Sequence, residues 1–169
     1  GRGAVSMRPS GYNRWSGREE DRATADCTFC DTDFVGTGPD GGKFPSPEAL
    51  AGAVARSWGP SLAHRYVVIT GGEPLLQLDV PLIEALHNEG FEIAIESNGT
   101  IAAPPGIDWI CISPKAGTHI VQRSGDELKL VYPQAGVDPA EFTGWDFTHF
   151  FLQPMDSPFR DQNTQAAID

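Results

Sequence analysis

The stretch RYVVITGGEP at residues 65–74 decides the fold. Its first six residues form a β-rich run that is typical of a buried strand, and two glycines, an acid and a proline follow directly. Residues 79–89 then show a helical pattern that stops at Gly90, and residues 91–96 form the next β-rich run. Because the loops of this β–α–β unit are short, we expect its two strands to be parallel.

The regular pattern extends to both sides of this unit. A helix is expected at residues 46–58, because Ser46 offers a hydroxyl for the N-cap, a proline follows, and Gly59 stops the pattern. Residues 1–45 show no such period and are expected to be irregular. The chain ends at Asp169 inside a helix-like stretch, and further strands are expected at 108–113, 127–131 and 149–153.

This order of elements predicts an α/β protein with fewer helices than strands. A closed eightfold β/α barrel requires about 250 residues, so it is excluded for this chain of 169 residues. We expect a single domain over residues 1–169, made of a loop region at 1–45 and a β/α core at 46–169. Both ends of the chain look cut, since it begins with Gly and ends within a helical pattern.

Composition excludes several classes of protein. Hydrophobic residues make up 40% of the chain, which excludes an intrinsically disordered one. The formal net charge of −11 argues against binding to a nucleic-acid backbone or to an anionic membrane surface. No apolar run approaches the roughly 20 residues of a transmembrane helix. An odd count of 3 cysteines does not form a disulfide framework, so we expect a reducing cytoplasm.

Polar residues follow four of the predicted strands. In parallel sheets the carboxyl ends of the strands share one rim, where ligands bind. Each cluster alone fits a turn, but the four together favour a binding site. Gly71 and Gly72 let the backbone approach a ligand closely, and Glu73 would repel a phosphate and accept bonds from an ammonium group. The four clusters are residues 70–74, 96–99, 113–115 and 153–156.

Two cysteines, Cys27 and Cys30, lie two residues apart in the loop before the core. A structural zinc site would need four ligands, and the remaining candidates show no paired ligand spacing. A redox-active dithiol should follow a strand and open a helix, which this loop does not do. An iron–sulfur cluster usually takes three or four thiolates. Cys111, in a predicted strand, is most simply a small buried apolar residue.

These motifs together resemble the radical S-adenosylmethionine enzymes and, within that superfamily, the 7-carboxy-7-deazaguanine synthases. The resemblance runs nearly end to end and rests on several specific motifs. They are WSGREEDR at 15–22, CTFCDTDF at 27–34, TGGEP at 70–74, IAIESNG at 93–99, ISPK at 112–115 and QPMD at 153–156.

The resemblance implies an open, partial parallel β/α barrel. It implies a radical ring contraction of 6-carboxy-5,6,7,8-tetrahydropterin to 7-carboxy-7-deazaguanine with loss of ammonia, a step of queuosine biosynthesis. The implied cofactors are a [4Fe–4S] cluster, S-adenosylmethionine and Mg²⁺. The implied partners are the pterin substrate, a flavodoxin-type electron donor and a second copy of the chain in a homodimer.

By position in the motifs, the resemblance assigns roles to individual residues. Cys27 and Cys30 match cluster ligands, and Thr32 matches the Mg²⁺ contact. Arg8 and Thr70 match substrate contacts, and Glu96 is expected to face the substrate on the same rim. The expected S-adenosylmethionine contacts are Phe29, Gly72, Glu73, Ser113, Pro114, Lys115, Gln153, Pro154, Met155 and Asp156.

The sequence departs from the family pattern in three places. Tyr12 stands where the first cluster cysteine is expected, and two thiolates are a poor donor set for a [4Fe–4S] cluster. The residues around it, Ser6 to Ser10, are polar and broken by proline, unlike the apolar strand expected there. The N-terminal and C-terminal substrate segments of the family are absent. Two alternatives therefore stand beside the enzyme, namely an impaired remnant that only binds S-adenosylmethionine or substrate, and a small structural metal-binding protein.

Overall fold

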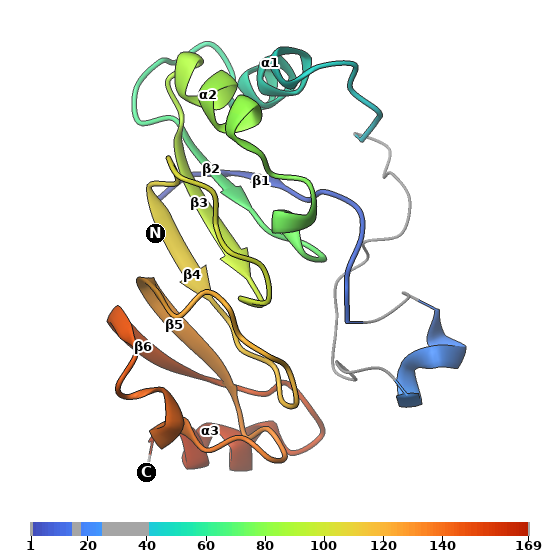
Figure 1. Ribbon diagram of the computed structural model, residues 1–169, viewed down its shortest axis with the longest axis vertical. Helices are drawn as coiled ribbons and strands as arrows, with labels where there is room; N and C mark the ends of the chain where they lie inside the picture. The colour runs from blue at the N-terminus through green and yellow to red at the C-terminus, as the bar shows by residue number, and fades with distance from the viewer. Residues whose placement is uncertain (1, 15–17, 25–40, 169) are drawn as a thin grey trace.

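A computed structural model describes residues 2–14, 18–24 and 41–168. Its centre is one sheet of six parallel strands, whose spatial order follows the order of the chain. Figure 1 shows this sheet running through the length of the molecule. The strands are β1 (Val5–Met7), β2 (Tyr66–Ile69), β3 (Glu92–Ser97), β4 (Trp109–Ile112), β5 (Ser124–Tyr132) and β6 (Asp146–Pro154).

The helices of the described residues cover this sheet unevenly. The α-helices α1 and α2 pack on each other beside β1–β3, and α3 lies against β5 and β6 (Figure 1). None of these helices has the length and apolar character needed to cross a membrane. Their bounds are α1 (Pro47–Trp58), α2 (Val80–Asn88) and α3 (Arg160–Ile168), and the short 3-10 segments are η1 (Glu19–Thr24), η2 (Pro74–Leu76) and η3 (Pro139–Phe142).

Local sequence explains where the first two helices begin. The Ser46 hydroxyl accepts a hydrogen bond from the Ala49 N–H at 3.3 Å, and the Asp79 carboxylate accepts one from the Leu82 N–H at 3.0 Å. Gly59 then ends α1 with its N–H bonded to the Ala55 carbonyl. The β–α–β unit and the helix before it are therefore confirmed.

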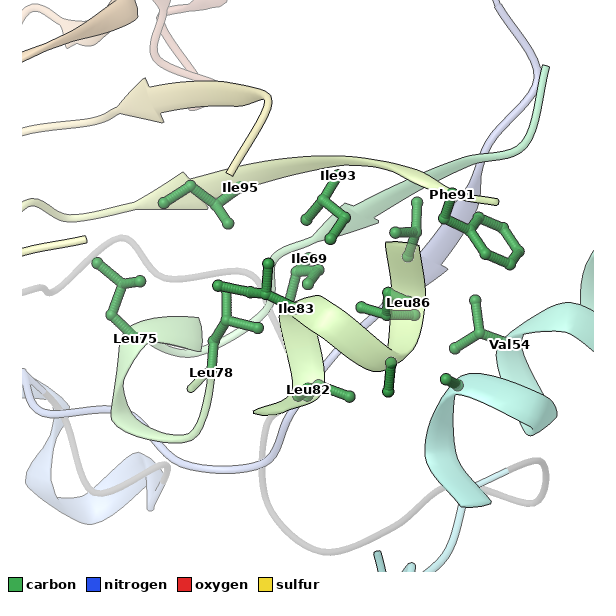
Figure 2. Packing of buried hydrophobic residues seen from close by; sticks show 13 residues of the cluster. Val54, Ile69, Leu75, Leu78, Leu82, Ile83, Leu86, Phe91, Ile93 and Ile95 are labelled. Atoms are coloured by element: carbon green, nitrogen blue, oxygen red, sulfur yellow. The ribbon is translucent and has the colours of Figure 1, made fainter. Parts of the chain in front are cut away.

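The main core fills the space between the sheet and α1 and α2. Ile69, Ile93 and Ile95 alternate along β2 and β3 toward the helices, where Leu86 is fully buried (Figure 2). A second apolar cluster lies under β4–β6 and consists of Ile112, Leu128, Leu130, Phe142 and Phe147. The side chains between these core positions therefore face the other side of the sheet, called here the inner face.

One expectation about the first 45 residues is wrong. The polar stretch beginning at Ser6 is not irregular, because Val5–Met7 form β1 and pair in parallel with β2. Val5 and Met7 pack against the core while Ser6 is exposed, so the strand has one buried side only. Pro9 follows the strand, where it removes no ladder hydrogen bond. With this strand included, the fold is an open, partial β/α barrel with fewer helices than strands, as predicted.

Candidate active site

Three expected substrate contacts lie in one line across the inner face. Glu96 pairs in register with Cys111, Cys111 with Glu127, and Glu127 with His149. Thr70 and Arg8 directly follow the paired residues Ile69 and Met7, which places them at the next register positions toward the rim. We call this set the inner row, and its members are Arg8, Thr70, Glu96, Cys111, Glu127 and His149.

The centre of the inner row is polar and partly shielded from solvent. The Lys129 ammonium lies 3.0 Å from the Glu96 carboxylate, and the Cys111 thiol lies 3.5 Å from the Glu127 carboxylate. Burial, followed by the nearby acids, raises the pKa of Cys111 to about 12, although Lys129 opposes this. Burial alone would lower the pKa of Lys129, but the negative charges that face it, among them the Glu96 and Glu127 carboxylates, raise that pKa. Cys111 is therefore a protonated, buried thiol, as expected from its place in a strand.

The turn after β2 brings the N-terminal segment onto the rim. A Cβ atom at Gly72 would lie 1.8 Å from the Gly11 carbonyl oxygen and 3.2 Å from the Tyr12 Cβ atom. The Gly11 carbonyl accepts a hydrogen bond from the Glu73 N–H at 2.9 Å. Gly71 has a φ of +111° and lies against Arg8, so an L side chain would be strained there. Both glycines are needed for this close approach.

Glu73 points into the protein and not into open space. Its side chain is 0% exposed, and one oxygen accepts hydrogen bonds from the Leu75 N–H at 3.1 Å and the Ser97 hydroxyl at 2.8 Å. The other oxygen accepts one from the Asn98 N–H at 2.9 Å. Burial raises the pKa of Glu73, and these three donors oppose that effect. Glu73 therefore ties the turn after β2 to the loop after β3, and its direct contact with an ammonium group stays a prediction.

The segment after β4 is held at the same rim. The Ser113 N–H donates to the Ser97 carbonyl at 2.8 Å, and the Lys115 ammonium donates to the Ser113 hydroxyl at 2.7 Å. The buried Gln134 fixes the outer side of this segment, since its amide donates to the Pro114 carbonyl and accepts from the Ala116 N–H. The structure thus brings Ser113, Pro114 and Lys115 beside the loop that Glu73 organises.

The last predicted cluster follows β6 at the far edge of the sheet. Gln153 is exposed and pairs in register with Val131, and Pro154 ends the strand. The Met155 N–H donates to the Tyr132 carbonyl at 2.7 Å, and the Met155 carbonyl accepts from Asn163 of α3 at 2.8 Å. Residues 153–156 therefore stand at the carboxyl ends of the strands, with exposed Asp156 closing the segment.

Several side chains of the inner face, some of them members of the inner row, are not predicted as site residues from the sequence. Glu127 and Lys129 alternate with buried leucines in β5, and this period of two is the signal that could have found them. His149 stacks on Trp109 at 5.9 Å between ring centroids and on Phe151 at 6.2 Å. The inner face therefore combines a polar centre with an aromatic side near β6.

Within the described residues, no thiolate is available to hold an iron–sulfur cluster. Clusters are held by thiolates, whereas Cys111 is a protonated thiol and Tyr12, at the rim beside Gly72, offers a phenol. Cys27 and Cys30, together with Phe29 and Thr32, lie outside the described residues. In the part of the chain that the structure describes, no group of three His, Cys, Asp or Glu side chains could hold a metal ion. The described residues therefore do not fit a three-thiolate cluster.

Comparisons with known proteins agree with this architecture. The profile of the Radical SAM superfamily matches residues 21–125. The 7-carboxy-7-deazaguanine synthase of Caulobacter vibrioides is 60% identical over 169 residues, covering 99% of this chain and 80% of that protein. The synthase of Bordetella pertussis is 59% identical over 99% of this chain and 80% of that protein. The synthase of Bacteroides thetaiotaomicron is 33% identical over 100% of this chain and 81% of that protein. The chain therefore belongs to the 7-carboxy-7-deazaguanine synthase family, whose members are enzymes of the radical S-adenosylmethionine superfamily.

Proposed function

We propose that this chain catalyses the ring contraction of 6-carboxy-5,6,7,8-tetrahydropterin to 7-carboxy-7-deazaguanine with loss of ammonia. Family membership supports the reaction, and the superfamily implies a [4Fe–4S] cluster and S-adenosylmethionine. One structural observation carries the proposal for this chain. Arg8, Thr70 and Glu96 take neighbouring register positions on one face, directly beside the Gly-Gly turn.

Each of these three residues suits one part of the pterin. The Arg8 guanidinium is exposed at the rim and can pair with the substrate carboxylate through two parallel hydrogen bonds. The Thr70 hydroxyl can donate to or accept from a ring heteroatom. The Glu96 carboxylate can accept hydrogen bonds from ring N–H groups, which a pterin presents on its pyrimidine side.

The S-adenosylmethionine site is proposed along the rim above this row. Backbone groups around Gly72 would receive the methionine part, with Glu73 fixing that turn from below. Residues 113–115 and 153–156 would line the remainder, and Phe29 would lie beside the adenosine. These assignments rest on the motifs and on the shared position of the segments at the strand ends.

Further parts of the proposal rest on the family resemblance. They are a Mg²⁺ ion at Thr32, cluster ligation by Cys27 and Cys30, a flavodoxin-type electron donor and a homodimer. The free thiol of Cys111 accords with the reducing cytoplasm that we propose as its location. Residues 1–169 are proposed to fold as one domain.

Tyr12 favours a second candidate function. A chain with two cluster cysteines and a phenol would bind S-adenosylmethionine or the pterin without turning them over. This candidate needs the same rim and the same inner row, so binding alone does not separate it from the enzyme.

Anaerobic reconstitution with iron and sulfide separates the two candidates. The wild-type chain and a Tyr12→Cys variant are compared for bound iron and, after addition of the pterin substrate, S-adenosylmethionine and a chemical reductant, for 7-carboxy-7-deazaguanine by mass spectrometry. Product from the wild-type chain supports the enzyme, and product from the variant alone supports the binding-only candidate. If neither chain releases product although the variant carries a full cluster, the proposed reaction is refuted.

A further inference from the structure

Lys129 of β5 makes an ion pair that reaches across the sheet. Its ammonium lies 3.0 Å from the Glu96 carboxylate of β3, so the contact spans β4 between them. The Lys129 side chain is 22% exposed and that of Glu96 is 42% exposed, which leaves the carboxylate open toward the inner face. A lysine placed in this way fixes the direction of a carboxylate without covering it.

The residue between the two partners makes this reach possible. Cys111 is the register partner of Glu96 on β4 and is small and buried, so a long side chain from β5 can pass over it. Glu127, the register partner of Cys111 on the other side, is engaged by the Cys111 thiol at 3.5 Å. The ammonium of Lys129 is therefore directed to Glu96 and not to the acid on its own strand.

We propose that Lys129 is a positioning residue that holds the Glu96 carboxylate ready to accept N–H groups of the pterin ring. This inference rests on the proposed function, because it requires Glu96 to contact the substrate. In the absence of substrate the ammonium fixes one oxygen of Glu96, and the second oxygen stays available. Without Lys129, the carboxylate would swing among rotamers and meet the ring in the wrong geometry.

The pair has little to do with holding the sheet together. Partly exposed ion pairs contribute little to stability, since solvent screens them and ordering two side chains costs entropy. The loss of Lys129 should therefore weaken binding while leaving the unfolding temperature nearly unchanged. A merely structural role would show the opposite pattern.

The test measures binding of 6-carboxypterin, the air-stable aromatic form of the substrate, to the full chain by fluorescence titration. This readout does not require turnover. Lys129→Met is expected to weaken binding about tenfold, and Lys129→Arg, which keeps the charge, should restore most of the affinity. Lys43→Met removes an exposed lysine outside the site and serves as the matched control, with unchanged affinity expected.

A double-mutant cycle with Glu96→Gln shows whether Lys129 acts through Glu96. If it does, adding Lys129→Met to Glu96→Gln should lower the affinity for 6-carboxypterin by less than about twofold, because the Glu96 carboxylate is already lost. Wild-type affinity in Lys129→Met, or losses that multiply fully in the double variant, would overturn the inference while leaving the proposed function intact. Failure of the wild-type chain to bind 6-carboxypterin would instead overturn the proposed function and the inference with it.

Discussion

The buried carboxylate of Glu73 gives the most demanding test of how the rim is built. It receives hydrogen bonds from the Leu75 N–H, the Ser97 hydroxyl and the Asn98 N–H, and it is 0% exposed. Replacing it with alanine leaves two backbone donors buried with no acceptor. The Ser97 hydroxyl can rotate, but backbone N–H groups cannot.

The expected cost follows from these contacts. Each buried donor without a partner costs about 1–3 kcal/mol, so Glu73→Ala should lose about 3 kcal/mol of unfolding free energy. Burial of the charge raises the pKa of Glu73 and offsets part of the stabilisation from its hydrogen bonds. The expected loss of unfolding free energy is therefore moderate. For a chain of this size, the loss corresponds to a melting temperature lower by about 6–12 °C. The melting temperature of Glu73→Gln should lie between those of the wild-type chain and Glu73→Ala, since the amide NH₂ group of glutamine would face a donor.

Thermal unfolding followed by circular dichroism measures the effect on the cluster-free chain. Glu84→Ala, which removes an exposed glutamate from α2, is the matched control and should change the unfolding free energy by less than about 0.5 kcal/mol. If Glu73→Ala had the same melting temperature as Glu84→Ala, the three hydrogen bonds would contribute nothing to stability and the proposed role of Glu73 at the rim would be wrong.

Three other changes test separate parts of the structure. Gly72→Ala should prevent the N-terminal segment from docking, because the added Cβ atom would lie 1.8 Å from the Gly11 oxygen; limited proteolysis should then cut that segment faster than in the wild-type chain, and equal rates would contradict the contact. Leu86→Ala, at a fully buried core position, should cost about 2–5 kcal/mol in urea unfolding, and a loss below 1 kcal/mol would place this side chain outside the core. Cys111 should resist iodoacetamide at pH 8 until the chain is unfolded, since its thiol pKa is raised to about 12 and only the thiolate reacts; rapid labelling of the folded chain in a peptide map would disprove its burial.

Local signals in the sequence are sufficient to predict the elements that have their own capping residues and a regular repeat of apolar residues. Ser46 and Gly59 bound α1 as predicted, because capping is a property of neighbouring residues. The strand of residues 5–7 is not predicted from the sequence, since this short stretch becomes a strand only by pairing with β2. The strands β5 and β6 are longer than predicted for the same reason, because their first residues are held by pairing with each other.

For the candidate site as well, the sequence predicts some residues and only the structure shows the others. Sequence motifs point to Arg8, Thr70 and Glu96, and the structure brings these three residues to one face. The burial of Glu73 was not predicted, because it depends on where the loop after β3 places two N–H groups. Lys129 was also missed, since its contact with Glu96 joins strands that are not neighbours in the sheet.

A crystal structure of the chain with 6-carboxypterin and S-adenosylmethionine would show directly where the substrate binds. We expect the pterin on the inner face, with its carboxylate at Arg8 and its ring N–H groups at Glu96. We also expect S-adenosylmethionine along the rim between Gly72 and residues 113–115. Pterin density on the helix-covered face, or at the rim with Arg8 and Glu96 both out of contact, would contradict the proposed substrate site.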